Sequence, residues 1–360
     1  MTILSGSYVS MFKEFTAAWI YVAVMLLFAV PMWFFSSNYF EAARKINVPF
    51  WLGAAGVASV VAATAQQAQL LLDVLPGSDL ASLGGLVRPS GLSGSFLHYP
   101  LFISLVFFVF AQLWSSRRRA IYSLLAAVFA VAVVVSFSRS GAMILIFGIA
   151  AFAVTSRNAS QRVRFVFAGI SLAMILSLVM RDTIYATRIA SSVDLEAGGN
   201  AGRITGWMNA LELWADSPMV IGGYTGMYTN ITQNFGEASS GVVESGILQQ
   251  LISVGLIGAV LYYALMIATI MAVDKRHAWL RAGMLGAVLE TFVYQSVEVV
   301  PFMIAFLLMP IVSMHIAGDD PGYWKGMIAP AARRSFGAVA RAARLPIGSR
   351  APHADSHRTR

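Results

Sequence analysis

Cysteine is absent from this sequence of 360 residues. Disulfide bonds, thiolate metal sites and cysteine nucleophiles are therefore excluded. The five histidines are scattered along the chain, and no Gly-Lys-Ser or Gly-Lys-Thr motif follows a glycine-rich stretch. We therefore expect neither a metal ion nor a cofactor.

Charged residues are also scarce. They make up 12% of the sequence, whereas hydrophobic residues make up 58% and the mean hydropathy is +0.71. A soluble domain carries about 25% charged residues. The composition therefore indicates a membrane protein that crosses the bilayer several times. No signal peptide is evident before Phe15, so we take the first apolar segment as a retained span.

The apolar segments predict an all-α transmembrane bundle. We expect about nine spans, within a range of eight to ten, because each segment approaches the length of a membrane-crossing helix. The predicted spans lie at about 16–35, 50–66, 96–114, 120–137, 141–154, 165–180, 245–272, 281–299 and 301–317.

The basic residues predict the orientation. They gather in alternate loops, at 44–45, 117–119, 157–164 and 275–281, and beyond Gly318. Cytoplasmic loops are enriched in Lys and Arg, so we assign these segments to the cytoplasm. The net charge of +8 is then mainly a topology signal, and a nucleic-acid partner has little support. Nine spans would leave the N-terminus outside, which is unusual without a leader and raises the suspicion that a first helix is missing.

This orientation divides the chain into a transmembrane domain at 1–318 and a basic cytoplasmic tail at 319–360, which we expect to be disordered. A large periplasmic loop at 181–243 is inserted in the domain. Several arginines fall on the outer side, and these need an explanation because basic residues there oppose the usual bias. They are Arg88, Arg139, Arg181, Arg188 and Arg203.

The large loop contains one amphipathic helix. Trp207, Ala210, Leu211 and Trp214 recur at intervals of three and four residues, with Arg203 just before them. Such a helix can lie along the membrane surface and cover the bundle as a lid. The glycines that follow the helix allow tight turns and a close approach of the backbone to a ligand. They are Gly222, Gly223 and Gly226.

The order of these features resembles the O-antigen ligase and O-antigen polymerase superfamily of bacterial polysaccharide assembly. The resemblance covers roughly residues 80 to 270, and its motifs are specific in their order and spacing rather than singly. Its elements are Arg88 to Gly91, the pair Ser138-Arg139, Arg203 with Trp207 followed by Pro218, Gly222 and Gly223, and Glu244 with Leu248 before Gly255-Leu256-Ile257-Gly258.

The resemblance implies metal-independent glycosyl transfer from a polyprenyl (undecaprenyl) diphosphate-linked oligosaccharide, on the outer face of the bacterial inner membrane. Guanidinium groups bind phosphate oxygens in pairs and stabilise the charge that develops on a departing diphosphate. The residues expected to do so are Arg88, Arg139, Arg188 and Arg203, of which Arg139 and Arg203 are also taken as catalytic.

Glu244 is our candidate for the general base that activates the acceptor hydroxyl. The ligases usually have histidine at this position, so a glutamate favours a polymerase. As an alternative, Glu244 caps the helix that begins near Ser245. Trp207, Tyr224 and Tyr228 could stack on sugar rings, although anchoring at the membrane interface explains tryptophan equally well.

Glu290 and Glu298 lie eight residues apart in one predicted span, and so close to one helical face. We expect these acids to support the outer arginines. A proton-coupled transporter would also need such acids. Our preferred function is polymerisation of lipid-linked repeat units, with flippase and chain-length regulator proteins as possible partners. The alternatives are a ligase that passes glycan to lipid A core or protein, and a transporter of lipid-linked glycan or ions.

Overall fold

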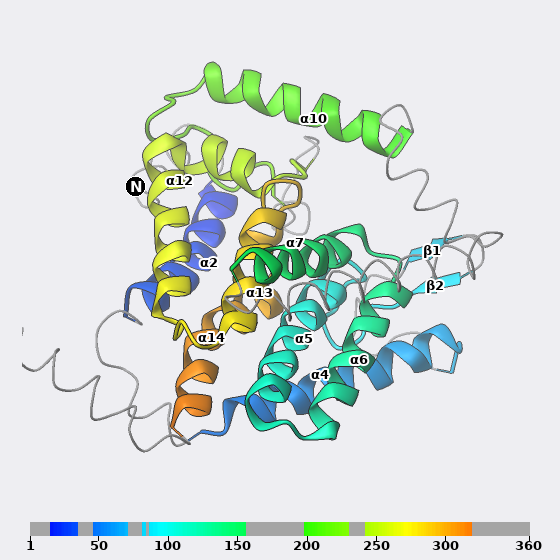
Figure 1. Ribbon diagram of the computed structural model, residues 1–360. Helices are drawn as coiled ribbons and strands as arrows, with labels where there is room; N and C mark the ends of the chain where they lie inside the picture. The colour runs from blue at the N-terminus through cyan, green and yellow to red at the C-terminus, as the bar shows by residue number, and fades with distance from the viewer. Residues whose placement is uncertain are drawn as a thin grey trace, which may run out of the picture. The chain divides into compact units, whose positions relative to one another are not determined.

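The computed structural model describes residues 15–34, 46–70, 81–83, 86–155, 198–229 and 242–318. Within these ranges the protein is helical apart from one short hairpin, so the all-helical prediction is confirmed (Figure 1). The described residues up to Ile316 form one compact unit, and the contacts below lie within it. The predicted span at 165–180, Arg181, Arg188 and the tail at 319–360 lie outside the described residues.

The helices follow the apolar segments of the sequence closely. They are α2 (Phe15–Phe34), α4 (Val48–Gln67), α5 (His98–Arg117), α6 (Ala120–Val135), α7 (Arg139–Thr155), α10 (Gly198–Ala215), α12 (Gly246–Ala272), α13 (Ala278–Glu290) and α14 (Val300–Ala317), with a 3-10 turn, η1 (Ser296–Glu298). Four of the described helices, α4, α5, α12 and α14, are long and apolar enough to cross a membrane, and Trp19–Pro31, α6 and α7 are shorter apolar helices. The count of nine spans stays a prediction.

A short hairpin lies between α4 and α5 in the chain. Strand β1 (Ala81–Leu83) pairs antiparallel with β2 (Leu86–Arg88), and Ala81 lies opposite Arg88. Two glycines separate the strands in the sequence. Such a pair is a hairpin signal because both residues accept positive φ angles.

Close packing of α7 on α13 builds the centre of the bundle. A Cβ atom on Gly286 would lie 2.6 Å from the backbone nitrogen of Gly148, so only glycine allows this approach. Farther along the same pair of helices, the rings of Phe152 and Trp279 stack with centroids 3.9 Å apart. These contacts fix the second half of α7 against α13.

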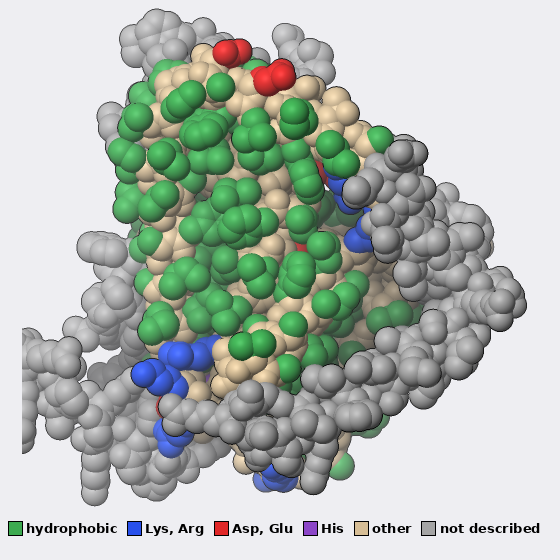
Figure 2. Space-filling model, turned by 45° about the horizontal axis from the view of Figure 1, so that its top comes forward, with side chains coloured by type: hydrophobic (Ala, Val, Ile, Leu, Met, Phe, Trp, Pro, Cys, Tyr) green, Lys and Arg blue, Asp and Glu red, His purple; other side chains and the backbone are tan. Residues whose placement is uncertain are grey.

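The helices alternate in direction, so the bundle has two chemically different ends. Trp279 at the start of α13 donates its backbone N–H to Gln112 near the end of α5, at 3.2 Å. The connections at 117–119 and 273–277 therefore lie at one end, which we call the basic end. Figure 2 shows one group of Lys and Arg side chains along the lower edge of a largely hydrophobic face, and a second group higher up at the right, near acidic side chains.

The opposite end, called the site end, carries the starts of α5, α7 and α12. Ser104 near the start of α5 donates to the carbonyl of Gly141 near the start of α7, at 2.9 Å. Gln67 at the end of α4 donates to the carbonyl of Val135 at the end of α6, at 3.0 Å. Among the described residues, Arg88 and Arg139 thus lie at this end of the bundle.

Helix α12 covers the predicted span at 245–272 and is long and apolar enough to cross a membrane, but it is broken inside. Gly255 has φ 71° and ψ −178°, a conformation that is not helical. The loop after α10 fills the break: Leu256 N–H donates to the carbonyl of Met219, and the N–H groups of Gly223 and Tyr224 donate to that of Ile252. The backbone groups freed by the break are therefore satisfied inside the protein, as a membrane environment requires.

The predicted span at 281–299 is wrong. Helix α13 ends at Glu290, and Glu298 belongs to η1, so the two acids do not share one helical face. The chain then enters α14, whose second residue is Pro301. Proline is favoured in the first turn of a helix, where its missing N–H group would have no partner, so Pro301 suits the start of α14.

Candidate active site

Helix α10 brings the predicted site residues together at the site end. The amphipathic helix predicted around Trp207 exists and runs from Gly198 to Ala215, where it packs against α12. Ala210 is fully buried on this side, in a cluster with Val243 and Ile252. This cluster holds α10 over the first half of α12 (Figure 1).

The carboxylate of Glu244 accepts a hydrogen bond from Nε of Arg203 on α10, and the two groups form an ion pair. The side chains are 40% and 32% exposed, so this pair is accessible to a ligand. Glu244 is therefore not the helix cap. Ser245 takes that role, since its side chain accepts from the N–H of Leu248.

Trp207 lies one turn after Arg203 and binds the same residue. Its indole Nε1 donates to the backbone carbonyl of Glu244 at 3.1 Å. Two successive turns of α10 thus hold both the side chain and the backbone of Glu244. The ring of Trp207 remains only half-buried.

Arg139 reaches the same helix from the other side. One of its terminal nitrogens donates to the side-chain oxygen of Asn200 at 2.6 Å. Asn200 stands three residues before Arg203, so both lie on one face of α10. Arg139, Asn200, Arg203 and Glu244 form a continuous polar row, which we call the arginine row.

Sequence reasoning missed Asn200. Its signal was a polar residue one helical turn before Arg203, at the start of the predicted lid helix. Asn200 is 9% exposed, and a buried amide in such a position needs a polar partner. Arg139 supplies that partner.

Arg88 belongs to a different element from the residues of the arginine row. It stands on β2, and its guanidinium carbon lies 4.1 Å from the centre of the Phe96 ring. The loop that follows β2 is fixed by Gln66, whose side-chain oxygen accepts from the N–H groups of Ser90 and Gly91. Arg88 therefore has a place of its own at the site end.

Tyr224 and Tyr228 form an edge-to-face pair with ring centroids 5.6 Å apart. Tyr228 also packs against the cluster under α10. Burial, followed by the neighbouring Tyr224, raises the pKa of Tyr228, so its hydroxyl stays neutral at physiological pH. The nearby Gly222 faces the backbone of Ser253 rather than a ligand, because a Cβ atom there would lie 2.7 Å from it.

Glu290 and Glu298 are both buried near the arginine row. The carboxylate of Glu290 accepts from the hydroxyl of Ser296 at 2.6 Å, and among the described residues it forms no ion pair with an arginine. Tyr294, between the two acids in sequence, lies within electrostatic range of Glu290, Glu298, Glu244 and Arg203. The acids thus lie behind the row.

The arrangement offers fixed cations, one carboxylate next to a cation, and a half-buried indole. Guanidinium groups of this kind bind phosphate esters, and a carboxylate beside them can take a proton. The described residues contain no cluster of three or more His, Cys, Asp or Glu that could hold a metal ion.

No curated protein and no solved structure matches the chain. One family model does match, and its span includes the whole arginine row. The resemblance stated from the motifs is thereby confirmed: residues 124–263 match the model described as O-antigen ligase, which is consistent with the O-antigen ligase and polymerase superfamily.

Proposed function

We propose that this membrane protein is a glycosyltransferase that polymerises polyprenyl diphosphate-linked oligosaccharide units. The family match supports glycan transfer in a membrane at the coarser level. The observation that carries the finer proposal is the ion pair between Arg203 and Glu244, with Arg139 joined to the same helix through Asn200.

The arginine row provides a site for the donor diphosphate. Arg139 and Arg203 approach α10 from different elements, so two guanidinium groups can face one diphosphate. Both are fixed before the substrate arrives, and fixed charges stabilise a leaving group without reorganisation during the reaction. Arg188, outside the described residues, is a further candidate for this site.

Donor binding would release the base. While Arg203 is paired with Glu244, the guanidinium occupies the carboxylate and keeps it from an acceptor hydroxyl. A diphosphate carries more negative charge than one carboxylate, so it competes for Arg203 and leaves Glu244 free. Glu244 would then be available as a base only when the donor is in place, which protects the donor from hydrolysis.

The transfer step moves one proton, forms one glycosidic bond and breaks the bond to the diphosphate. The acceptor hydroxyl loses its proton to the carboxylate of Glu244 while its oxygen forms a bond to the anomeric carbon of the donor sugar. The bond between that carbon and the diphosphate oxygen breaks, and the electron pair goes to the diphosphate. Trp207 would stack on a sugar ring beside Glu244.

The site would face the periplasm of a bacterial inner membrane, with the basic end in the cytoplasm. A ligase is the second candidate, because the matching family model is described as O-antigen ligase. Both enzymes use the same donor chemistry, and they differ in the acceptor. Flippase and chain-length regulator proteins are proposed partners.

Replacement of the arginines tests this proposal. We expect Arg203→Ala and Arg139→Ala to lower transfer at least about a hundredfold, because each loses a fixed contact to the leaving group. Arg203→Lys should retain part of the activity, since lysine keeps the charge but not the paired N–H groups. Arg119→Ala, at the basic end, is the matched control and should be active.

Glycan analysis of cells that lack the native gene gives the readout. Accumulated single repeat units would indicate a polymerase, whereas intact long chains that fail to reach lipid A core would indicate a ligase. Unaltered glycans in both alanine variants, with normal protein levels in the membrane, would refute glycosyl transfer at the arginine row.

A further inference from the structure

Helix α10 has apolar side chains on two sides, and only one of these sides is buried. The inner side carries Trp207, which is half-buried, and Ala210, which is fully buried in the cluster with α12. The second apolar side carries Ile204, Met208 and Leu211, which recur at intervals of four and three residues and so share one face. These three side chains are 40%, 57% and 42% exposed. We call them the outer flank.

The next side of α10 is polar. Thr205, Asn209 and Glu212 each follow a residue of the outer flank directly, so they are rotated from it by about 100° around the helix axis. All three are exposed, and none is basic. Helix α10 therefore presents a protein-facing side, an exposed apolar side and an exposed polar side in turn. An exposed apolar side next to a polar one is typical of a helix that lies in a membrane interface.

The loop after α10 continues the exposed apolar surface onto α12. Met219 and Val220 are 45% and 52% exposed. The indole of Trp214 on α10 donates to the carbonyl of Met219 at 3.1 Å, and the N–H of Leu256 on α12 donates to the same carbonyl at 2.8 Å. Ile257, whose N–H donates to the carbonyl of Val220, and Leu256 are themselves 41% and 48% exposed. The loop thus lies against a helix that is long and apolar enough to cross a membrane.

We infer that the outer flank of α10, together with Met219 and Val220, inserts into the membrane leaflet at the site end. Lipid is the partner that fits, because this surface continues into the exposed apolar surface of α12, and because the polar side beside it needs water. In Figure 2, acidic side chains lie at the upper edge of the view, above a face that hydrophobic side chains cover. Arg203 is the neighbour of Ile204 on α10, so the arginine row lies at the level of the lipid headgroups. The inference does not depend on sugar transfer.

Spin labels on single cysteines test this insertion in the full chain, which has no cysteine of its own. The protein is placed in vesicles of phosphatidylethanolamine and phosphatidylglycerol, and the collision rates of each label with oxygen and with a water-soluble nickel chelate are measured. Oxygen concentrates in lipid, whereas the chelate stays in water. The outer-flank variants are Ile204→Cys, Met208→Cys and Leu211→Cys, and their matched controls, each one residue later, are Thr205→Cys, Asn209→Cys and Glu212→Cys.

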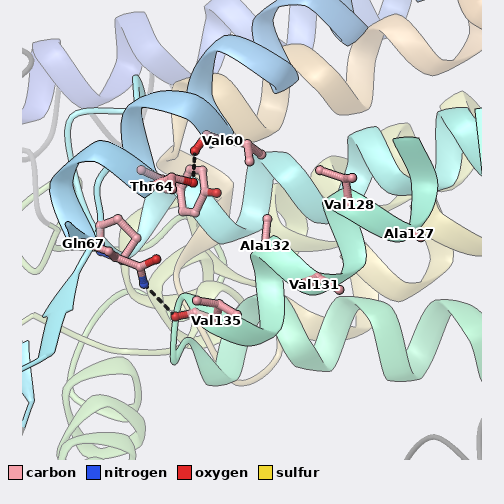
Figure 3. Close-up of a pocket in the computed structure, with 11 residues that line it drawn as sticks. Val60, Thr64, Gln67, Ala127, Val128, Val131, Ala132 and Val135 are labelled. Carbon is pink, nitrogen blue, oxygen red and sulfur yellow. Dashed lines mark hydrogen bonds between the residues drawn. The ribbon is translucent and has the colours of Figure 1, made fainter. Parts of the chain in front are cut away.

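We expect oxygen collisions to exceed nickel collisions at the outer flank, and the reverse order at each matched control. Val131→Cys on α6 and Val260→Cys on α12 give the reference for lipid. Their side chains are 60% and 58% exposed, and Val131 lines an apolar groove between α4 and α6 (Figure 3). Six labelled positions give independent readings, so the pattern does not depend on any one variant.

A charge on the outer flank should withdraw the helix from lipid, because a carboxylate is unfavourable in hydrocarbon. We expect Met208→Asp to lower the ratio of oxygen to nickel collisions for a label at Leu211→Cys. Asn209→Asp adds the same charge on the polar side and should leave this ratio unchanged. An equal effect of the two substitutions would contradict insertion of the outer flank.

Frequent nickel collisions at the outer flank would overturn the inference, because this side would then face water. Rare collisions with both reagents would also overturn it, since a protein surface, such as a second copy of this chain, would then cover the flank. No sugar is transferred in this assay. Inactive chemistry at the arginine row would therefore leave a positive result valid, and a negative result would leave the proposed transfer untouched.

Discussion

Glu244 has two contacts that can be separated by substitution. Its carboxylate pairs with Arg203, and its backbone carbonyl accepts from Trp207. Glu244→Gln removes the charge and the base but keeps the carbonyl, so the contact to α10 survives. We expect transfer to fall about a hundredfold or more, because general bases contribute roughly that much.

Initial transfer rates with a purified lipid-linked donor measure this effect. Glu244→Asp keeps the carboxylate and should recover part of the rate. Trp207→Phe keeps an aromatic ring but loses the donor to the carbonyl, and should weaken the lid contact by about 1 kcal/mol. A Glu244→Gln variant that transfers sugar at the normal rate would exclude Glu244 as the base.

His277 predicts a pH dependence of stability at the basic end. It precedes α13, is 5% exposed, and its Nδ1 lies 2.7 Å from the hydroxyl of Ser313 on α14. Burial lowers the pKa of His277 to about 4, with Asp274 partly opposing this shift. The unfolded chain, in which the ordinary pKa is about 6.5, therefore binds more protons between these values.

Neutral His277 contributes fully to the free energy of unfolding above about pH 6.5, and this contribution is lost as the pH falls toward 4. At pH 5 the free energy of unfolding should be lower by about 2 kcal/mol. The thermal unfolding midpoint in detergent should drop between pH 7.5 and 5.0 in the native chain. His277→Asn should show a smaller drop, and an identical drop would contradict this source of pH dependence.

Among the helices, the broken α12 determines where Glu244 stands. The first half, Gly246–Val254, is tied to the end of α13, since Gly246 N–H donates to the carbonyl of Thr291 at 2.7 Å. The second half, Leu256–Ala272, continues as an apolar helix. The break thus allows Glu244 to lie under α10 instead of continuing the line of the span.

Gly255→Ala should destabilise this arrangement. The residue has φ 71°, and a Cβ atom would lie 2.3 Å from the carbonyl oxygen of Val220. We expect the free energy of unfolding to fall by about 1–3 kcal/mol, because the backbone is strained and the loop that fills the break is displaced. Thermal unfolding with a parallel transfer assay would detect both effects.

Gly206→Ala is the matched control, because nothing lies within 4 Å of a Cβ atom at this helical position in α10. Alanine is the better helix former, so this variant should be as stable or gain about 0.5–1 kcal/mol. Equal stability of both variants would show that the break in α12 tolerates a side chain.

For the molecule as a whole, the separation of its two ends predicts the orientation in the cell. Because the chain has no cysteine, single cysteines report position without background. In spheroplasts, a membrane-impermeant maleimide should label Asp216→Cys on the exposed end of α10. It should label Arg118→Cys only after lysis, because our proposal places the basic end in the cytoplasm. The opposite labelling pattern would reverse the proposed orientation.

The two glutamates of the predicted eighth span show where sequence reasoning fails. Apolar residues continue beyond Glu290, so hydropathy extends the predicted span to 299, whereas α13 ends at Glu290. The turn that follows places the hydroxyl of Ser296 against the Glu290 carboxylate. Local hydrophobic periodicity does not predict such a side-chain hydrogen bond, because the bond forms only when the turn is packed inside the protein.

The sequence by itself determined the membrane class, the helices α4 to α7, the lid helix and the distribution of basic residues. These properties depend on composition and on local spacing, because a bilayer imposes the same length and polarity on every span. Only the tertiary structure decided that Arg203 pairs with Glu244, that Asn200 holds Arg139, and that α12 breaks at Gly255. Those contacts join residues far apart in the chain, and their energies exist only once the helices have packed.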